Sequence, residues 1–301
     1  MELNVERVSK VFGKRWAVHD VSLRLEPGMI GLVGPNGAGK TTLMRMMAAL
    51  IPPTEGRLSW NGVDLQQSAM ALRRTLGYLP QEFGVYPELS GRRFLRYLAA
   101  MKGLPRDLAN HRVDELIELV NLEHDADRRL GAYSGGMKQR IGIAQSLLND
   151  PELLIVDEPS AGLDPSEHIR FRTLLSSLTA DRIVILSTHI ISDVEAVASR
   201  IVILGEGRVV VDSDPESLIS SAAGQVWTLT TDAVTAARLQ STLQVSGLIS
   251  QRHAVTLRLI SSSRPHDGAF PAEPTLEDAY LLATGGSWAR EHEPAFMPSG
   301  Q

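Results

Sequence analysis

One short segment constrains the fold of this chain more than any other. The sequence GPNGAGKT, residues 34–41, lies between an apolar run, Met29–Val33, and a helical run, TLMRMMAAL. It matches G-x-x-x-x-G-K-[ST], in which backbone N–H groups surround phosphate oxygens and the lysine reaches the β- and γ-phosphates. A strand before the motif and a helix after it are the context that the motif requires. The segment therefore predicts an α/β fold that binds a nucleotide.

The residues that would contact the phosphates follow from the motif. The glycines let the backbone turn, Lys40 supplies the positive charge, and the hydroxyl of Thr41 can take a Mg²⁺ site. We predict that the nucleotide is bound by Gly34, Pro35, Asn36, Gly37, Ala38, Gly39, Lys40, Thr41 and Thr42.

Four apolar runs indicate the sheet that carries this loop. They are Met29–Val33, Leu153–Val156, Ile183–Leu186 and Ile201–Leu204, and none of them alternates with polar residues. Uninterrupted apolar strands are typical of parallel sheets that are buried on both faces. We expect all four in one mostly parallel sheet with covering helices.

Segments outside this sheet give the domain organisation. Residues 85–130 carry apolar residues at helical spacing and predict a helical insert. The small-residue run SSAAG marks a boundary, so that residues 1–222 form the first domain. Alternating strands and a helix capped by Thr275 predict a small α+β domain over 223–284, and the tail 285–301 is expected to be disordered.

Two carboxylates directly follow the apolar run LLIV. Asp157 and Glu158 would lie at the carboxyl edge of the sheet, where α/β proteins bind ligands. Asp157 suits Mg²⁺, and Glu158 could orient and deprotonate an attacking water. His189 follows another strand in LSTH and should emerge at the same edge. Taken alone, acidic residues commonly cap strand ends, and a lone histidine there is more often a helix-start residue. The phosphate loop is the reason to interpret these residues as catalytic.

A second glycine pair lies far downstream, in AYSGGMKQR (residues 132–140). Apolar residues follow it at helical spacing, so the serine and the glycines would open a helix. Unpaired N–H groups at such a start hold anions. The chain therefore carries two phosphate cradles.

Composition excludes several classes of protein. The chain has 301 residues and a formal net charge of −5, and it contains no long Lys/Arg run, so a wide nucleic-acid footprint is not expected. The absence of cysteine excludes disulfides and thiolate chemistry. We see no run of about 18 apolar residues and no signal-peptide core. The sequence predicts a chain that neither crosses a membrane nor is secreted.

The order of the motifs resembles that of one family. GPNGAGKTT, Pro80–Gln81, YSGGMKQR, LLIVDEP, SAGLD and STH follow one another as in the ATP-binding cassette (ABC) ATPases, the nucleotide-binding subunits of ABC transporters. The resemblance covers about residues 3–217 and implies a P-loop NTPase cassette with an N-terminal β region and ATP and Mg²⁺ as cofactors. It also implies a head-to-tail dimer, in which the Ser-Gly-Gly start of one cassette closes on the ATP of the other. The second cradle would serve the partner's nucleotide.

The resemblance implies roles for single residues. Gln81 would sense Mg²⁺ and water at the hinge to the helical insert, and His189 would be the switch residue on the γ-phosphate. Asp164, in SAGLD, would link the two sites of the dimer. The expected metal ligands are Thr41, Gln81 and Asp157. The residues expected on the partner's γ-phosphate are Ser134, Gly135 and Gly136.

Two positions need separate comment. Phe12 stands where the family has an aromatic residue that stacks on adenine, usually a tyrosine, and Trp16 is a rival for this role. Met137 replaces the family's usual glutamine after Ser-Gly-Gly, which puts any polar contact from that side chain to the partner's ribose in doubt.

The end of the second domain, EPTLEDAYLLATGG, resembles the ATPase subunits of two-component exporters. That resemblance implies a peripheral protein on the cytoplasmic face of the membrane, bound to a separate permease through the insert near Val85–Phe94. A soluble ABC ATPase of DNA repair or translation is the first alternative, but it would be expected to carry a coiled-coil insertion or a second cassette. A P-loop kinase or GTPase is the second, and it leaves the Ser-Gly-Gly segment unexplained.

Overall fold

The computed structural model describes residues 1–159, 165–179, 181–251 and 254–285. It divides into two compact units, Met1–Val209 and Val210–Gln301. The division lies before the boundary predicted after residue 222, because helix α8 (Pro215–Ser221) packs against α10 (Leu276–Ala283). Asp164 and nearly all of the tail predicted to be disordered lie outside the described residues.

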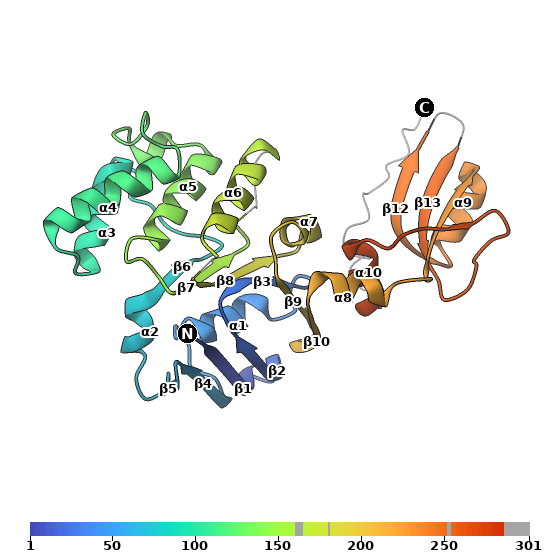
Figure 1. Ribbon diagram of the computed structural model, residues 1–301, viewed down its shortest axis with the longest axis horizontal. Helices are drawn as coiled ribbons and strands as arrows, with labels where there is room; N and C mark the ends of the chain where they lie inside the picture. The colour runs from blue at the N-terminus through green and yellow to red at the C-terminus, as the bar shows by residue number, and fades with distance from the viewer. Residues whose placement is uncertain (160–164, 180, 252–253, 286–301) are drawn as a thin grey trace. The chain divides into compact units, whose positions relative to one another are not determined.

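The larger sheet (Figure 1) has six strands in the order β10-β9-β3-β8-β7-β6, and all of them except β10 lie wholly in the first unit. Strand β3 pairs in parallel with β8 and β9, and β7 pairs in parallel with β8 and β6. Every residue of β7 and β8 is buried. The four apolar runs are strands of one mostly parallel sheet, which confirms the predicted fold class. The strands are β3 (Gly28–Val33), β6 (Leu76–Leu79), β7 (Leu153–Asp157), β8 (Ile183–Thr188), β9 (Arg200–Gly205) and β10 (Arg208–Ser213).

An antiparallel sheet with the order β2-β1-β4-β5 forms the N-terminal β region. Helix α1 (Lys40–Met47) contacts this sheet and also contacts β7 of the larger one. Its buried residues Leu43, Met44 and Met47 belong to one apolar core with residues of both sheets. Packing against both sheets therefore fixes the position of α1, whose first turn follows directly after the phosphate loop. The strands are β1 (Leu3–Phe12), β2 (Arg15–Leu25), β4 (Glu55–Trp60) and β5 (Val63–Asp64).

The predicted insert contains two helices that pack together with a third. Helices α3, α4 and α5 contact one another and lie side by side in Figure 1. Apolar residues at helical spacing, such as Phe94, Leu95 and Val113, are buried between them. The helices of this unit are α2 (Met70–Thr75), α3 (Gly91–Met101), α4 (Arg106–Leu119), a short 3₁₀ turn (Leu130–Ala132), α5 (Gly135–Ser146), α6 (Pro165–Ser177) and α7 (Ile191–Glu195).

The second unit is a small α+β domain, as the sequence predicts. Its antiparallel sheet has the order β12-β13-β11-β14, and leucines from β11 and β13 form a core with α9. Thr275 caps α10 through a capping box with Asp278. The elements are α8, β11 (Val226–Thr231), α9 (Ala233–Gln240), β12 (Gln244–Ser250), β13 (Val255–Ile260), β14 (Phe270–Pro271) and α10.

Among the described residues of this domain, Asp278 is the buried ionic group. Its carboxylate is fully buried and accepts hydrogen bonds from Arg258 Nε at 2.9 Å, Thr275 N at 2.7 Å and the hydroxyl of Ser246. Burial raises the pKa of Asp278, but the hydrogen bonds from Arg258, Ser246 and Thr275 outweigh burial and hold the pKa below its usual value. A buried carboxylate with such partners stabilises the fold only while it is ionised.

We expect Asp278→Asn to lower the free energy of unfolding of the second unit by about 2–4 kcal/mol at pH 7, because Arg258 and the other donors lose the negative charge to which they bind. Because the pKa of Asp278 is lower in the folded state, its carboxylate stabilises the fold fully at pH values above the unfolded-state pKa of about 3.9. This stabilisation is lost as the pH falls through the folded-state pKa. The difference between variant and wild type should therefore shrink below about pH 4. Urea unfolding at pH 7 and pH 3 measures it, with the exposed Asp267→Asn as control, and a difference that is independent of pH would contradict the prediction.

Candidate functional site

The loop between β3 and α1 is shaped by close backbone approaches. A Cβ atom on Gly39, whose φ is +101°, would lie 2.3 Å from the carbonyl oxygen of Ala17, and one on Gly34 would lie 2.4 Å from that of Leu204. No side chain fits at either position. The loop is thus held tightly between β2 and β9, with its N–H groups at the start of α1 where an anion is favoured.

Lys40 lies over this loop. Its Nζ donates to the carbonyl oxygens of Gly34 at 2.7 Å and Pro35 at 3.1 Å, and the side chain is 5% exposed. The same atom is 3.6 Å from Glu158 Oε1. The ammonium group is therefore fixed between the phosphate loop and the carboxyl edge of the sheet.

Glu158 is the meeting point of the residues that the sequence analysis proposed as catalytic. Gln81 Nε2 donates to Glu158 Oε2 at 3.2 Å, and His189 Nδ1 lies 3.5 Å from the same oxygen. The three residues follow β6, β7 and β8, which are neighbours, so their carboxyl ends bring them together. Glu158 also has a φ of +44°, an uncommon conformation for a non-glycine residue that is enriched at functional sites.

Asp157 lies beside Glu158 at the end of β7 and is fully buried. Neither of its oxygens accepts a hydrogen bond of ordinary geometry within the described chain, although the hydroxyls of Thr41 and Ser187 lie close enough to affect its pKa. Burial raises the pKa of Asp157, and these two hydroxyls oppose the rise. A buried carboxylate without a full partner is the environment in which a cation binds. The described residues hold no cluster of three or more His, Cys, Asp or Glu side chains, so other oxygens would have to complete a metal site.

Lys40, Gln81 and Glu158 line an open cleft of about 370 Å³, whereas Asp157 and His189 are not among its lining residues. Phe12 lines it and is 54% exposed, whereas Trp16 does not line it and packs against His19 at a ring distance of 4.8 Å. Arg15, which sequence reasoning missed, also lines the cleft. Its position three residues after Phe12, at the start of the next strand, was the available signal. The other lining residues are Ala17, Asn36, Gly37, Ala38, Gly39, Thr41 and Thr42.

The Ser-Gly-Gly segment is a helix start, as expected, but it does not belong to this cleft. Ser134 is the N-cap of α5 and accepts a hydrogen bond from Met137 N at 3.2 Å. Ser134 and Gly135 are exposed, and neither they nor Gly136 line the cleft of their own chain. The start of a long helix, with its N–H groups open to solvent, therefore faces outward. Asp164, proposed to link two sites, lies outside the described residues.

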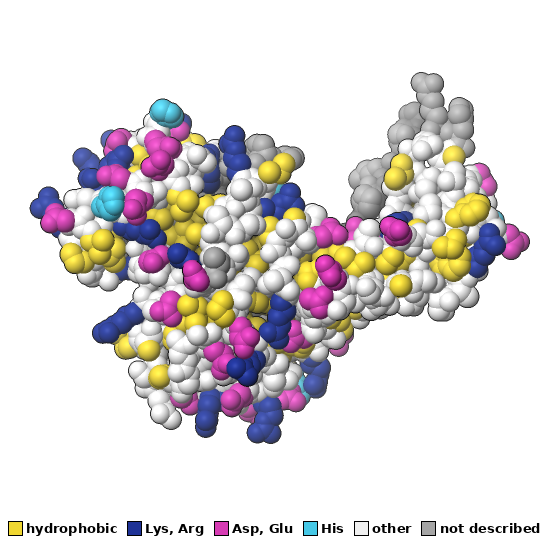
Figure 2. Space-filling model, viewed as in Figure 1, with side chains coloured by type: hydrophobic (Ala, Val, Ile, Leu, Met, Phe, Trp, Pro, Cys, Tyr) yellow, Lys and Arg dark blue, Asp and Glu magenta, His cyan; other side chains and the backbone are white. Residues whose placement is uncertain are grey.

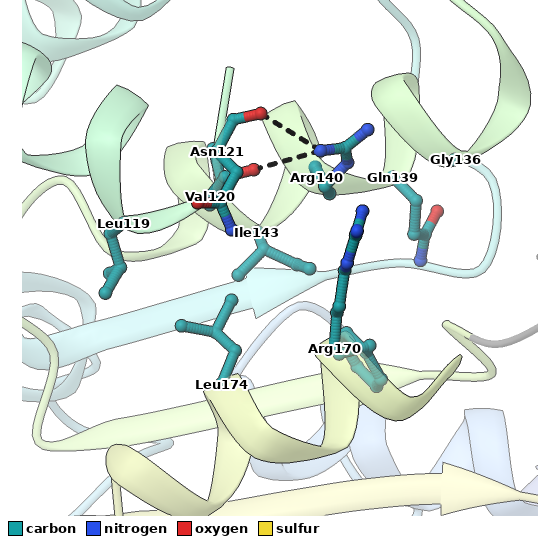
Figure 3. A pocket seen from close by; sticks show the side chains of 10 residues that line it. Leu119, Val120, Asn121, Gly136, Gln139, Arg140, Ile143, Arg170 and Leu174 are labelled. Carbon is teal, nitrogen blue, oxygen red and sulfur yellow. Dashed lines mark hydrogen bonds between the residues drawn. The ribbon is translucent and has the colours of Figure 1, made fainter. Parts of the chain in front are cut away.

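The arginine of YSGGMKQR has a structural role that the motif did not indicate. Arg140 donates to the carbonyl oxygens of Asn121 at 3.0 Å and Val120 at 3.4 Å, at the C-terminus of α4 (Figure 3). A cation there satisfies carbonyl groups and opposes the helix dipole. The small cavity beside it, about 30 Å³ between α5 and α6, is too small for a nucleotide.

The chain after Gln81 packs against α5. A Cβ atom on Gly142 would lie 2.6 Å from the ring of Phe83 and 2.9 Å from the side chain of Leu79, so the ring rests directly on the helix backbone. Because Gly142 has no side chain, the two segments approach closely. The position of Gln81 is therefore coupled to that of α5.

The site combines a phosphate loop after β3, the lysine of that loop and two carboxylates at the end of β7, and a glutamine and a histidine converge on the second carboxylate. This arrangement defines a P-loop nucleotide hydrolase. A model of the family described as "ABC transporter" matches residues 18–161. A Nod factor export ATP-binding protein from Cupriavidus metallidurans is 37% identical over 224 residues, which is 74% of this chain and 74% of that protein. An ABC transporter ATP-binding protein from Bacillus subtilis is 36% identical over 75% of this chain and 76% of its own length.

Solved structures agree with this assignment. An ATP-binding subunit of an ABC transporter is 30% identical, covers 73% of this chain and 93% of its own, and superposes with a TM-score of 0.67. A cassette from Clostridium perfringens, part of an ABC transporter complex, is 27% identical over 72% and 90% of the two chains, with a TM-score of 0.64. A dimeric cassette bound to ADP and Pi is 24% identical, covers 70% of this chain and 98% of its own, and has the same fold, with a TM-score of 0.65.

The chain belongs to the ABC transporter family of ATP-binding proteins. It is an ATP-binding and ATP-hydrolysing motor subunit of a transporter. The predicted family, fold class and ATPase activity are confirmed. Across the described ranges, no helix has the length and apolar character needed to cross a bilayer.

Proposed function

We propose that this subunit powers an exporter by cycles of ATP-dependent dimerisation, with Glu158 as the general base. One observation carries the catalytic assignment: Lys40, Gln81 and His189 all lie within 3.6 Å of the Glu158 carboxylate. A general base must lie where the phosphate and the attacking water meet, and these contacts are made beside the phosphate loop. In this assignment Gln81 orients the water, and His189 contacts the γ-phosphate.

The cofactor of this reaction is proposed to be Mg²⁺ held with ATP. The residues fit such a site, because Asp157 presents two buried oxygens without full hydrogen-bond partners and the Thr41 hydroxyl lies near them. Mg²⁺ prefers oxygen ligands and is usually bound by one or two carboxylates together with substrate phosphates. When bound, the ion would neutralise charge that develops on the phosphate oxygens. Gln81 would be its third protein ligand.

Nucleotide binding is proposed to involve the nine phosphate-loop residues, with Phe12 on the adenine. Phe12 suits stacking because its exposed ring lines the cleft. The Lys10 Nζ atom lies 5.5 Å from the centroid of that ring. Trp16 is disfavoured because it lies outside the cleft lining. Arg15 is added as a group that can reach a phosphate or ribose.

The active form is proposed to be a head-to-tail homodimer. Its support is the exposed N-terminus of α5, which presents Ser134, Gly135 and Gly136 away from the cleft of the same chain. Such a helix start attracts an anion, and the γ-phosphate of a second chain provides one. The role of Asp164 between the two sites stays a prediction.

The partner is proposed to be an integral membrane permease, which would place the subunit on the cytoplasmic face of the membrane. The names of several relatives refer to Nod factor export, and this supports an exporter without identifying the cargo here. The docking surface is assigned to the insert. There Tyr86 and Tyr97 are 50% and 44% exposed and pack edge to face, close to the exposed Arg93 and Arg96. Aromatic residues and arginine are enriched at protein interfaces.

A nucleic-acid machine is the less favoured alternative. Lys and Arg side chains are interspersed with Asp and Glu side chains over the face of the molecule drawn in Figure 2. Such mixing gives little of the basic stripe that binds phosphate backbones.

Charge reversal of the docking surface should weaken binding to the permease without affecting ATP hydrolysis by the isolated subunit. Arg92 is unsuitable because it forms ion pairs with Asp114 and Asp127 within the insert, so we choose Arg93→Glu together with Arg96→Glu. We expect this variant to co-purify poorly with the proposed permease, while the ATPase activity of the isolated subunit stays within about twofold, a barrier change of about 0.4 kcal/mol. Arg73→Glu with Arg74→Glu, on the exposed face of α2, is the matched control.

The measurement is detergent extraction of membranes that contain the tagged subunit and the membrane protein, followed by quantification of the complex. Equal recovery of permease with both pairs of substitutions would show that the insert is not the docking surface. Recovery of the wild type with DNA or ribosomes and without a membrane protein would favour the nucleic-acid alternative.

A further inference from the structure

Behind the catalytic edge, three side chains form a hydrogen-bonded series that the nucleotide site does not use. Thr188, the last residue of β8, is 1% exposed, and Asp193 in α7 is 4% exposed. The Thr188 hydroxyl lies 3.3 Å from Asp193 Oδ2, and Asp193 Oδ1 lies 3.4 Å from His168 Nδ1 on α6. Burying a carboxylate costs free energy unless it is hydrogen-bonded, so the contacts from Thr188 and His168 both stabilise the buried Asp193 side chain.

The Thr188 hydroxyl also shapes the turn that contains His189. Its Oγ1 accepts a hydrogen bond from Ile190 N at 2.9 Å, which closes a turn around the residue between them. The hydroxyl has one proton to donate. We assign that proton to Asp193 Oδ2, which at 3.3 Å is closer than the other acceptor, the carbonyl oxygen of Ile190 at 3.5 Å. The carboxylate thereby fixes the hydroxyl, and the hydroxyl fixes the turn.

Helix α6 holds this series from the far side. His168 reaches Asp193, and Arg172 Nη1 donates to the carbonyl oxygen of Ser192 at 2.8 Å. Both contacts join α6 to α7, which follows the turn at His189. In the sequence α6 begins directly after Asp164.

We propose that His168, Asp193 and Thr188 are positioning residues that set the orientation of the His189 imidazole toward Glu158. This inference rests on the proposed role of His189 at the γ-phosphate. A turn fixed from α6 holds the ring where its Nδ1 meets Glu158 at 3.5 Å. None of the three residues lines the nucleotide cleft, so their loss should affect turnover and leave ATP binding intact.

The test compares Thr188→Val, which removes the hydroxyl at nearly constant volume, with Thr188→Ser, which keeps it. We expect kcat to fall about tenfold in Thr188→Val, and about threefold or less in Thr188→Ser, since each tenfold step is 1.4 kcal/mol of barrier. KM for ATP and the affinity for a fluorescent ATP analogue should stay within about twofold in both variants. Thr173→Val, at an exposed position on α6, is the matched control and should behave as the wild type.

A second variant keeps the test decisive if Thr188→Val does not fold. His168→Leu, at a partly exposed position, should lower kcat about fivefold, and His168→Asn, whose amide nitrogen can occupy the place of Nδ1, should restore most of it. Combining His168→Leu with Thr188→Val should cost little more than Thr188→Val alone, because residues that act through one path are not additive.

The outcomes separate this proposal from the function on which it rests. An inactive His189→Ala together with normal kcat in Thr188→Val and His168→Leu would overturn the positioning role alone. Equal losses in Thr188→Ser and Thr188→Val, or a rise in KM without a change in kcat, would also overturn it. An active His189→Ala would overturn the proposed role of His189 and the positioning role together.

Discussion

Replacing Glu158 with Gln should abolish ATP turnover and leave ATP binding intact. An amide of the same shape cannot accept the proton of the attacking water, and loss of a general base costs about 10²- to 10⁴-fold. Lys40 would lose its ion pair with Glu158 but would keep its hydrogen bonds to Gly34 and Pro35, so the phosphate loop should stay formed. The variant should accumulate as an ATP-bound dimer.

Phosphate release in a single turnover measures the chemical step, and size-exclusion chromatography with ATP measures the dimer. Glu88→Gln, on an exposed loop before α3, is the control and should hydrolyse ATP as the wild type does. If a homogeneous Glu158→Gln preparation hydrolyses ATP at a near-normal rate, Glu158 is not the base.

Ser134→Arg should stop hydrolysis without lowering the affinity of the monomer for ATP. The exposed N-terminus of α5 lies outside the cleft of its own chain, so an arginine there can obstruct only a site that forms between two chains. Activity should fall at least about 10²-fold, which corresponds to roughly 2.7 kcal/mol of barrier. ATP affinity is measured by titration of the dilute monomer.

Mixed dimers give the sharper measurement. A Ser134→Arg subunit paired with a Lys40→Ala subunit assembles one site from two intact halves and one site from two damaged halves. Recovery of activity beyond either variant alone would support the arrangement in trans. Weakened ATP binding by the Ser134→Arg monomer would instead place this segment in the site of its own chain.

Much of the nucleotide site could be predicted because its signals are local. The phosphate loop is contiguous, and the uninterrupted apolar runs identify buried strands whose last residues must lie at one edge. Asp157, Glu158 and His189 were expected at that edge, and each follows or ends its strand there. The start of α5 at Ser134 and the capping of α10 by Thr275 were likewise read from the residues themselves and are confirmed.

Other features depend on contacts between distant segments. Strand β3 lies between β8 and β9, and no periodicity in the sequence specifies which strands become neighbours. The contacts of Glu158 with Gln81 and His189 depend on this order. Arg140 appeared to belong to a phosphate motif, and its partners at the end of α4 became evident only with the packing of the helices. The boundary predicted after residue 222 followed composition, whereas the division at Val209 follows the contact of α8 with α10.

The contact between Phe83 and Gly142 joins parts that serve different nucleotides. In the proposed pair, Gln81 acts on the ATP of its own chain, whereas α5 presents Ser134 to the ATP of the partner. Between them an aromatic ring rests on bare helix backbone, where no flexible side chain can absorb a small displacement. A shift of α5 toward the partner must therefore also move the segment that carries Gln81. This packing would couple the two nucleotide sites mechanically, so that a conformational change at one site is transmitted to the other.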